Sequence, residues 1–114
     1  MAFELTQVGP VHVARLRGRL DSANSPELER ALREISETGG ARLLFDLGEL
    51  DYISSAGLRV LLLAAKKLRA ATPAGKLAMA GVHGHVREVF EMSGFLTLFP
   101  VADSVDAGLA QLQG

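Results

Sequence analysis

Residues 42–71 read RLLFDLGELDYISSAGLRVLLLAAKKLRAA, and this segment is the most informative about the fold class. Its first six residues contain the apolar run Leu43-Leu44-Phe45, which is typical of a short buried strand. A loop is expected over 48–54. A helix is predicted over 55–71, because apolar residues recur along one broad face: Leu58, Leu61, Leu62, Ala65 and Leu68. A buried strand followed by such a helix indicates an α/β unit.

The rest of the chain continues this alternation of strands and helices. Gly9-Pro10 predicts a turn between two antiparallel strands, and Pro26 fits the first position of a helix with Ser25 as its N-cap. The further predicted segments are strands 3–8, 11–17, 76–81 and 96–99, and helices 26–38, 84–93 and 103–112. The order is β-β-α-β-α-β-α-(β)-α. It predicts one α/β domain over 1–114, with a mixed, mostly parallel sheet of four to five strands and about four helices.

Two of these segments make predictions about packing. In the second strand, Val11 and Val13 share one face while Ala14 and Leu16 share the other, so either a bulge or burial on both faces is expected. In helix 84–93 the inward residues are predicted to be Val86, Val89, Phe90 and Met92.

Composition excludes several classes of protein. The 114 residues carry 12 basic and 13 acidic side chains, whereas a dedicated nucleic-acid binder is usually strongly basic. Without cysteine there is no disulfide scaffold, zinc ribbon or thiol nucleophile. The longest apolar run, 60–65, is too short to span a bilayer, and residues 1–10 do not resemble a signal peptide. A cytoplasmic protein without nucleic-acid or membrane partners is therefore expected.

Enzyme signatures are missing from the sequence. There is no glycine-rich phosphate loop, no dinucleotide-binding motif and no nucleophile elbow around Ser55. Two groups of side chains invite a metal or acid–base interpretation: the histidines His12, His83 and His85, and the acids Asp46, Glu49 and Asp51. Solvated histidines, loop polarity and helix capping explain them more simply. We therefore expect no catalysis, no cofactor and no metal.

The serine pair Ser54-Ser55 supports two interpretations. Either serine suits the N-cap of the following helix, and Gly57 allows close packing there. Alternatively, a phosphoserine at this position can change binding without unfolding the domain, because a helix N-terminus tolerates negative charge.

Three groups of segments, spanning nearly the whole chain, resemble one known family. They are Gly18-Arg19-Leu20-Asp21 with Ser25-Pro26-Glu27-Leu28; Leu43 to Leu47 with Leu50 to Leu58; and Gly94-Phe95 with Phe99, Val101 and Ser104. The family is that of STAS domains, specifically the bacterial anti-sigma factor antagonists. The resemblance implies a STAS-like single domain that acts by partner switching.

The resemblance also implies partners and site residues. An unmodified antagonist binds an anti-sigma factor that is a serine kinase, which releases a sigma factor; phosphorylation ejects the antagonist, and a metal-dependent serine phosphatase restores it. Ser55 matches the phosphorylated serine, and Asp21 matches an acidic loop position in the interface. The expected partner-binding residues are Asp21, Ser22, Ser54, Ser55, Ala56, Gly57 and Arg59.

The signature departs from the family pattern at two positions. Many members have aspartate before the acceptor and serine or threonine after it, where this chain has Ser54 and Ala56. Ser54 is therefore an alternative, less favoured acceptor. An alternative function is that of a STAS scaffold in a stress-signalling or lipid-transport complex, which binds partners without a phosphoswitch.

Overall fold

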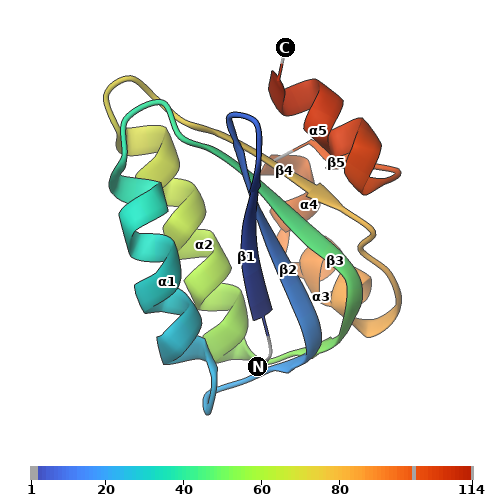
Figure 1. Ribbon diagram of the computed structural model, residues 1–114. Coiled ribbons are helices and arrows are strands. Elements are labelled where there is room, and N and C mark those ends of the chain that lie inside the picture. The colour runs from blue at the N-terminus through green and yellow to red at the C-terminus, as the bar shows by residue number, and fades with distance from the viewer. Residues whose placement is uncertain (1–2, 99, 114) are drawn as a thin grey trace.

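A five-stranded sheet in the order β1-β2-β3-β4-β5 forms the centre of the molecule (Figure 1). The structure is a computed structural model, and it describes residues 3–98 and 100–113. The strands are β1 (Phe3–Val8), β2 (Val11–Leu20), β3 (Arg42–Ile53), β4 (Lys76–Ala80) and β5 (Val101–Ala102). The helices are α1 (Ser25–Glu37), α2 (Ser55–Ala70), α3 (Gly84–Ser93), α4 (Phe95–Leu98) and α5 (Val105–Gln113).

Strand directions confirm the predicted fold class. β1 and β2 form an antiparallel hairpin, whereas β2, β3, β4 and β5 run parallel to one another. Each parallel step is connected through one or two helices, as parallel strands require. The sheet is therefore mixed and mostly parallel, with α4 as a helix beyond the four that the sequence predicts.

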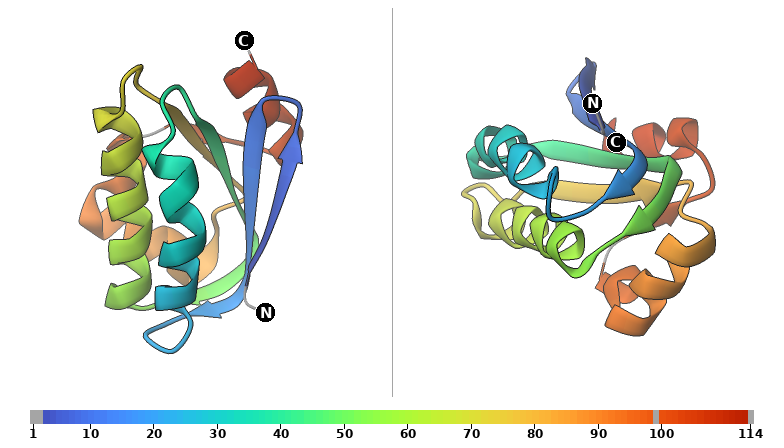
Figure 2. Two further views of the ribbon diagram at one scale, coloured as in Figure 1. Left: turned by 60° about the vertical axis from the view of Figure 1, so that its left-hand side comes forward. Right: turned by 90° about the horizontal axis from the view of Figure 1, so that it is seen from below.

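Helices cover both faces of the sheet, but unequally (Figure 2). The larger core lies between the sheet and α1, α2, α3 and α4, with Phe45 and Phe90 among its fully buried side chains. A smaller core lies under α5 on the opposite face, where Leu112 packs with Val13 and Leu44. Both cores draw on β2, β3 and β4.

Burial on both faces explains the apolar pattern of β2. Val11 and Val13 belong to the core under α5, while Ala14 and Leu16 belong to the larger core. A shift in the β2–β3 register also occurs, between Arg15 and Arg17. Both of the expected features are therefore present.

The prediction of a loop over 48–54 is wrong, because β3 continues to Ile53. The additional residues pair with the end of β2, where Gly18 lies opposite Leu50 and Leu20 lies opposite Ile53. Leu50 and Ile53 are buried in the larger core. A long parallel partner therefore holds this segment extended despite its polar residues.

The prediction of a strand over 96–99 is also wrong. Residues 95–98 form α4, the strand β5 begins at Val101, and Phe99 lies outside the described residues. The ring of Phe95 is buried and stacks on Phe90, with 4.8 Å between their centroids. This stacking favours a helical turn because it draws the chain back over α3.

Two smaller predictions are corrected as well. The N-cap of α1 is Asn24, because Ser25 is already helical and its buried hydroxyl donates to the carbonyl of Asp21. Met92 is 88% exposed. It lies two residues beyond the buried Phe90, which places it on the opposite side of α3.

Candidate functional site

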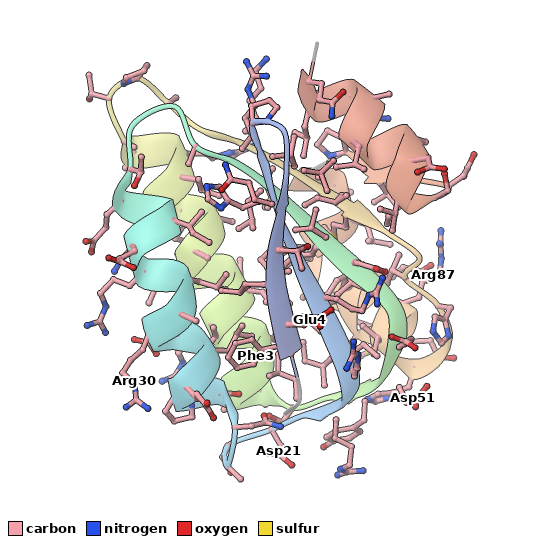
Figure 3. The ribbon with its side chains drawn as sticks, in the orientation of Figure 1. Phe3, Glu4, Asp21, Arg30, Asp51 and Arg87 are labelled. Carbon is pink, nitrogen blue, oxygen red and sulfur yellow. The ribbon has the colours of Figure 1, made fainter. Side chains whose placement is uncertain are left out.

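The predicted site lies where β2 and β3 end and where α1 and α2 begin. The backbone N–H of Ser54 donates to the carbonyl of Leu20 at 2.9 Å, and this bond joins the end of β3 to the end of β2. The loop from Asp21 to Asn24 therefore lies beside the first turn of α2. Asp21 and Asp51 are seen at this end of the molecule in Figure 3.

The two serines have different surroundings. Ser54 is the N-cap of α2, with φ −90° and ψ 173°, and its Oγ accepts the backbone N–H of Gly57 at 3.2 Å. Ser55 is the first residue of the helix and is exposed. Of the two hydroxyls, the one on Ser55 is thus accessible to another protein, whereas the one on Ser54 is occupied in capping.

Gly57 provides close packing at the start of α2, as predicted. A Cβ atom at this position would lie 2.8 Å from Cγ of Leu20, 2.9 Å from its carbonyl oxygen and 3.0 Å from Cγ1 of Ile53. Real Cβ atoms do not approach other atoms so closely. Because Gly57 is buried, it shapes the surface from beneath and is not itself offered to a partner.

The loop carrying Asp21 is held by hydrogen bonds of its own. Oδ1 of Asp21 accepts the N–H of Ala23 at 3.0 Å, while Oδ1 of Asn24 accepts the N–H of Asp21 at 2.9 Å. Nδ2 of Asn24 donates to the carbonyl of Arg19 at 2.8 Å. Asp21 is therefore a turn residue whose half-buried side chain is fixed beside the site, and Ser22 is exposed next to it.

Arg59 shares a hollow with residues of α1 and of the Asp21 loop. The hollow measures about 130 Å³ and is lined by Ser22, Ser25, Pro26, Glu29, Ala56, Arg59 and Val60. It brings three of the predicted site residues, Ser22, Ala56 and Arg59, onto one surface. Ser55 and Asp21 adjoin this surface as chain neighbours of Ala56 and Ser22.

A neighbouring aromatic cluster was not found by sequence reasoning. The guanidinium of Arg19 lies 4.1 Å from the ring centroid of Tyr52, and the ring of His85 stacks on Tyr52 at 5.1 Å. The three residues come from β2, β3 and α3, so they do not form a local sequence motif. Arg19 also pairs with Asp21 at 4.0 Å, which connects the cluster to the site.

The acidic residues near the end of β3 have partners elsewhere on the sheet. Oδ2 of Asp46 lies 3.2 Å from Nε of Arg15, and Oε2 of Glu49 lies 3.4 Å from Nε of Arg17. Nε2 of His83 lies 3.0 Å from the carbonyl oxygen of Gly48. Within residues 3–98 and 100–113, no three His, Asp or Glu side chains gather as metal ligands would.

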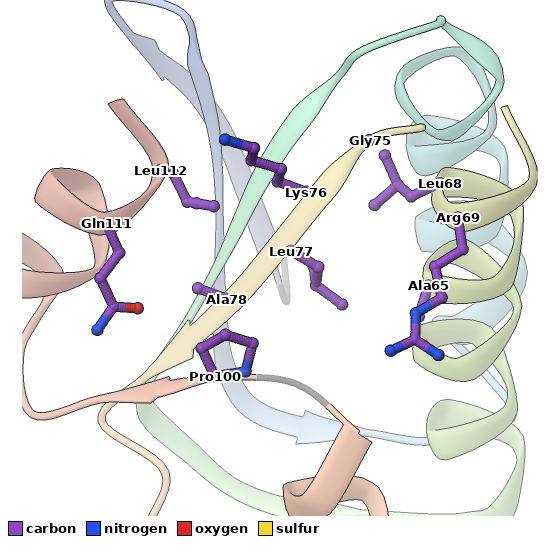
Figure 4. Close-up of a pocket in the computed structure, with 10 residues that line it drawn as sticks. All are labelled: Ala65, Leu68, Arg69, Gly75, Lys76, Leu77, Ala78, Pro100, Gln111 and Leu112. Atoms are coloured by element: carbon purple, nitrogen blue, oxygen red, sulfur yellow. The ribbon is translucent and has the colours of Figure 1, made fainter. Parts of the chain in front are cut away.

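A larger hollow lies at the other end of α2 and does not belong to this site. It measures about 290 Å³, between the last turns of α2, strand β4 and helix α5 (Figure 4). Its lining includes Leu68, Lys76 and Leu112. Leu68 is more than three helical turns from Ser55.

In the part of the chain that the structure describes, no helix has the length and hydropathy needed to cross a membrane.

Comparison with known proteins shows a likeness over nearly the whole chain. A family model for the STAS domain matches residues 2–108. BtrV of Bordetella bronchiseptica, a protein named as an anti-sigma factor antagonist, is 47% identical over 110 residues. This match covers 96% of the present chain and 93% of BtrV.

Solved structures share the fold. A Thermotoga maritima protein described as an anti-sigma factor antagonist matches with a TM-score of 0.86 at 16% identity, over 98% of this chain and 95% of that one. The phosphorylated form of SpoIIAA, a Bacillus cell fate determinant, matches with a TM-score of 0.73 at 21% identity. That match covers 93% of this chain and 96% of SpoIIAA. At such identities the likeness is one of fold.

Proposed function

The chain belongs to the STAS domain family, and from this premise we propose that it is an anti-sigma factor antagonist controlled by phosphorylation of Ser55. Its unphosphorylated form binds an anti-sigma factor that is a serine kinase, and this binding releases a sigma factor. The kinase then phosphorylates Ser55 and dissociates from the phosphorylated chain. A metal-dependent serine phosphatase returns the chain to its binding form.

The observation that carries this proposal is the exposure of Ser55 beside a serine that caps the helix. Because Ser54 already accepts the N–H of Gly57, the helix start does not depend on the hydroxyl of Ser55. Modification of Ser55 therefore leaves the first turn intact. The existence of a phosphorylated form of SpoIIAA, which shares this fold, supports the same interpretation.

Electrostatics explains how a phosphate would end binding. Phosphorylation adds about −1.5 to −2 charges at pH 7. Asp21 already contributes a carboxylate to this surface, and its partner Arg19 stands 4.0 Å away. A complex that covered both the phosphate on Ser55 and the carboxylate of Asp21 would have to remove water from two negative charges. This desolvation costs several kcal/mol unless the other protein supplies matching cations.

The proposed interface comprises the Asp21 loop and the first turn of α2. Asp21, Ser22, Ser55, Ala56 and Arg59 offer side chains to the kinase, while Ser54 and Gly57 hold the surface in shape. In this scheme the chain is the substrate of two enzymes and catalyses no step itself. We expect the switch to operate in the cytoplasm, where ATP and the transcription machinery are found.

The test is an affinity capture from lysate of the source cells, with ATP and magnesium added. The baits are the wild-type protein, Ser55→Ala, Ser55→Glu and Ser93→Glu, the last of which adds the same charge on an exposed residue at the end of α3. We expect Ser55→Ala and Ser93→Glu to retain a serine kinase that Ser55→Glu does not retain. Phosphosite mapping of the recovered wild-type protein should find the phosphate on Ser55.

Other outcomes would contradict the proposal in different ways. A phosphate on Ser54 with Ser55 unmodified would move the acceptor by one residue. Equal capture of one stable complex by all four baits, without phosphate, would favour the scaffold function. In that case Ser55 would be a surface residue without a switching role.

A further inference from the structure

Helix α2 is strongly cationic. It contains Arg59, Lys66, Lys67 and Arg69 and no acidic residue. Nζ of Lys67 lies 3.4 Å from Oε1 of Glu37, so this cation is paired. Arg59, by contrast, forms no ion pair or hydrogen bond with any residue in 3–98 or 100–113, although it is the cation nearest to the proposed phosphorylation site along the helix.

The acidic groups around Arg59 are already paired with other cations. Glu29, which lines the same hollow, lies 3.5 Å from Nη2 of Arg33. Asp21 lies 4.0 Å from Nε of Arg19. The exposed Arg59 guanidinium is therefore available to an additional anion, and no described carboxylate holds it away from the start of α2.

Helical spacing places Arg59 on the same side of α2 as Ser55. Residues four apart in a helix have Cβ atoms about 6 Å from each other, within reach of an arginine side chain. An anionic residue four positions before a cation is also the favourable order along the helix. The N–H of Gly57 is occupied by Ser54, so a phosphate on Ser55 gains little from that donor, and Arg59 is the first cationic residue after Ser55 in α2.

We propose that Arg59 binds the phosphate of phosphorylated Ser55 within the same helix, and that phosphorylation thereby withdraws Arg59 from the surface offered to the kinase. This inference rests on the proposed function, because it requires Ser55 to carry a phosphate. It gives phosphorylation two effects on binding. The modification adds negative charge beside Asp21, and it also occupies a cation that is free in the unmodified protein.

The chemistry of the two groups suits such a pair. A guanidinium presents parallel N–H donors that match two oxygens of one phosphate, and charge-assisted bonds of this kind are stronger than neutral ones. Lysine offers only a point charge at the same place. Replacement of Arg59 by lysine should therefore preserve part of the interaction, whereas replacement by glutamine should abolish it.

The experiment measures the second pKa of phosphoserine directly by ³¹P NMR. Phosphoserine is incorporated at position 55 during translation, so no kinase is needed, and the protein is titrated as wild type, Arg59→Gln, Arg59→Lys and Lys66→Gln. Pairing with a cation stabilises the dianion and lowers this pKa. We expect the pKa to be about 0.2–0.4 higher in Arg59→Gln than in wild type, with Arg59→Lys between them.

Lys66→Gln is the matched control, since it removes one exposed charge from the same helix about 10 Å farther along the axis. It should leave the phosphoserine pKa within about 0.1 of the wild-type value. A wild-type pKa in Arg59→Gln, or an equal rise in Lys66→Gln, would overturn the proposed pair. Failure of the capture experiment would instead contradict the proposed kinase partner. The NMR result does not depend on that outcome, because no kinase is used.

Discussion

Ser54 and Ser55 are adjacent and chemically identical, yet the fold places them in different surroundings. Ser54 has extended backbone angles that direct its hydroxyl back to the N–H of Gly57, while Ser55 has entered the helix and projects outward. One serine thus stabilises the helix and the other is free to be modified. A phosphoswitch at Ser55 would benefit from this separation, because within the described part of the chain the hydroxyl of Ser55 forms no hydrogen bond that a phosphate would break.

Substitution of each serine by alanine should reveal this separation. Ser54→Ala removes the N-cap and should lower the free energy of unfolding by about 1 kcal/mol. Ser55→Ala should change it by less than about 0.5 kcal/mol, as expected of an exposed position. Urea denaturation followed by circular dichroism measures both. Equal losses for the two variants would mean that Ser55 shares in the cap.

Gly57 is the position where a single methyl group should be costly. In Gly57→Ala the new Cβ would press on the carbonyl oxygen of Leu20, which is backbone and which also accepts the N–H of Ser54. We expect a loss of about 1–3 kcal/mol in the free energy of unfolding.

Gly48→Ala provides the comparison for Gly57→Ala. A Cβ at Gly48 meets only Oδ1 of Asp46, at an ordinary distance of 3.5 Å. The unfolding free energy of Gly48→Ala should stay within about 0.5 kcal/mol of wild type. If Gly57→Ala were as stable as this control, α2 would have room to move away from β2.

The sequence points to this proposed site but does not reveal all of the residues that surround it. Ser54, Ser55 and Gly57 form a local motif, so they could be found by inspection. Which serine caps the helix depends on backbone angles that either serine could adopt. The stacking of Arg19, Tyr52 and His85 depends on three elements meeting, and pairwise contacts between distant segments leave no mark on local patterns.

Among the elements, β3 is one of the three strands that contribute side chains to both cores. Leu43 and Phe45 face the larger core, while Leu44 faces α5. α5 lies close to β3 because Gly108 has no side chain: a Cβ there would be 2.7 Å from Cδ1 of Leu44. Among the described residues, α5 is otherwise held by the smaller core and by a hydrogen bond from Nη1 of Arg42 to the carbonyl of Gln113 at 3.3 Å.

Helix α5 should therefore open more readily than α1 or α2. Hydrogen exchange should show the amides of α5 exchanging faster than those of α2. Leu112→Ala should cost about 2 kcal/mol and accelerate exchange mainly in α5. Leu28→Ala, in the larger core, should accelerate exchange throughout the chain. Uniform acceleration by both variants would mean that α5 is as firmly integrated as the other helices.

Element boundaries were predicted less well than element types. The long apolar helix and the hairpin follow from local periodicity, so both were found. The extension of β3 to Ile53 depends on its pairing with β2, and the helical turn of α4 depends on the contact of Phe95 with Phe90. Both are consequences of tertiary contacts, which overrode the loop predicted over 48–54 and the strand predicted over 96–99.

In the molecule as a whole, the proposed site lies at one end of the central sheet. The ends of β2 and β3 and the starts of α1 and α2 meet there, and the larger core lies directly behind them. Neither core includes Ser55. A change of charge at Ser55 therefore alters the surface available to a partner and leaves the packing of the two cores unchanged.

The fold should accordingly be the same before and after phosphorylation. In ¹⁵N-HSQC spectra we expect shifts between the unmodified and phosphorylated proteins to be confined to residues 19–26 and 52–60. The unfolding free energy should change by less than about 0.5 kcal/mol. Shifts that spread to α5 would contradict a surface switch and would indicate a conformational one.

Tyr52 gives this surface an optical signal of its own. The chain has one tyrosine and no tryptophan, so its intrinsic ultraviolet fluorescence comes almost entirely from one ring. That ring contacts Arg19 and His85 and is joined through Arg19 to the Asp21 loop. Any event that rearranges these neighbours changes the brightness of the only strong emitter, and the unlabelled protein can therefore be followed in real time at the place where its proposed partners arrive.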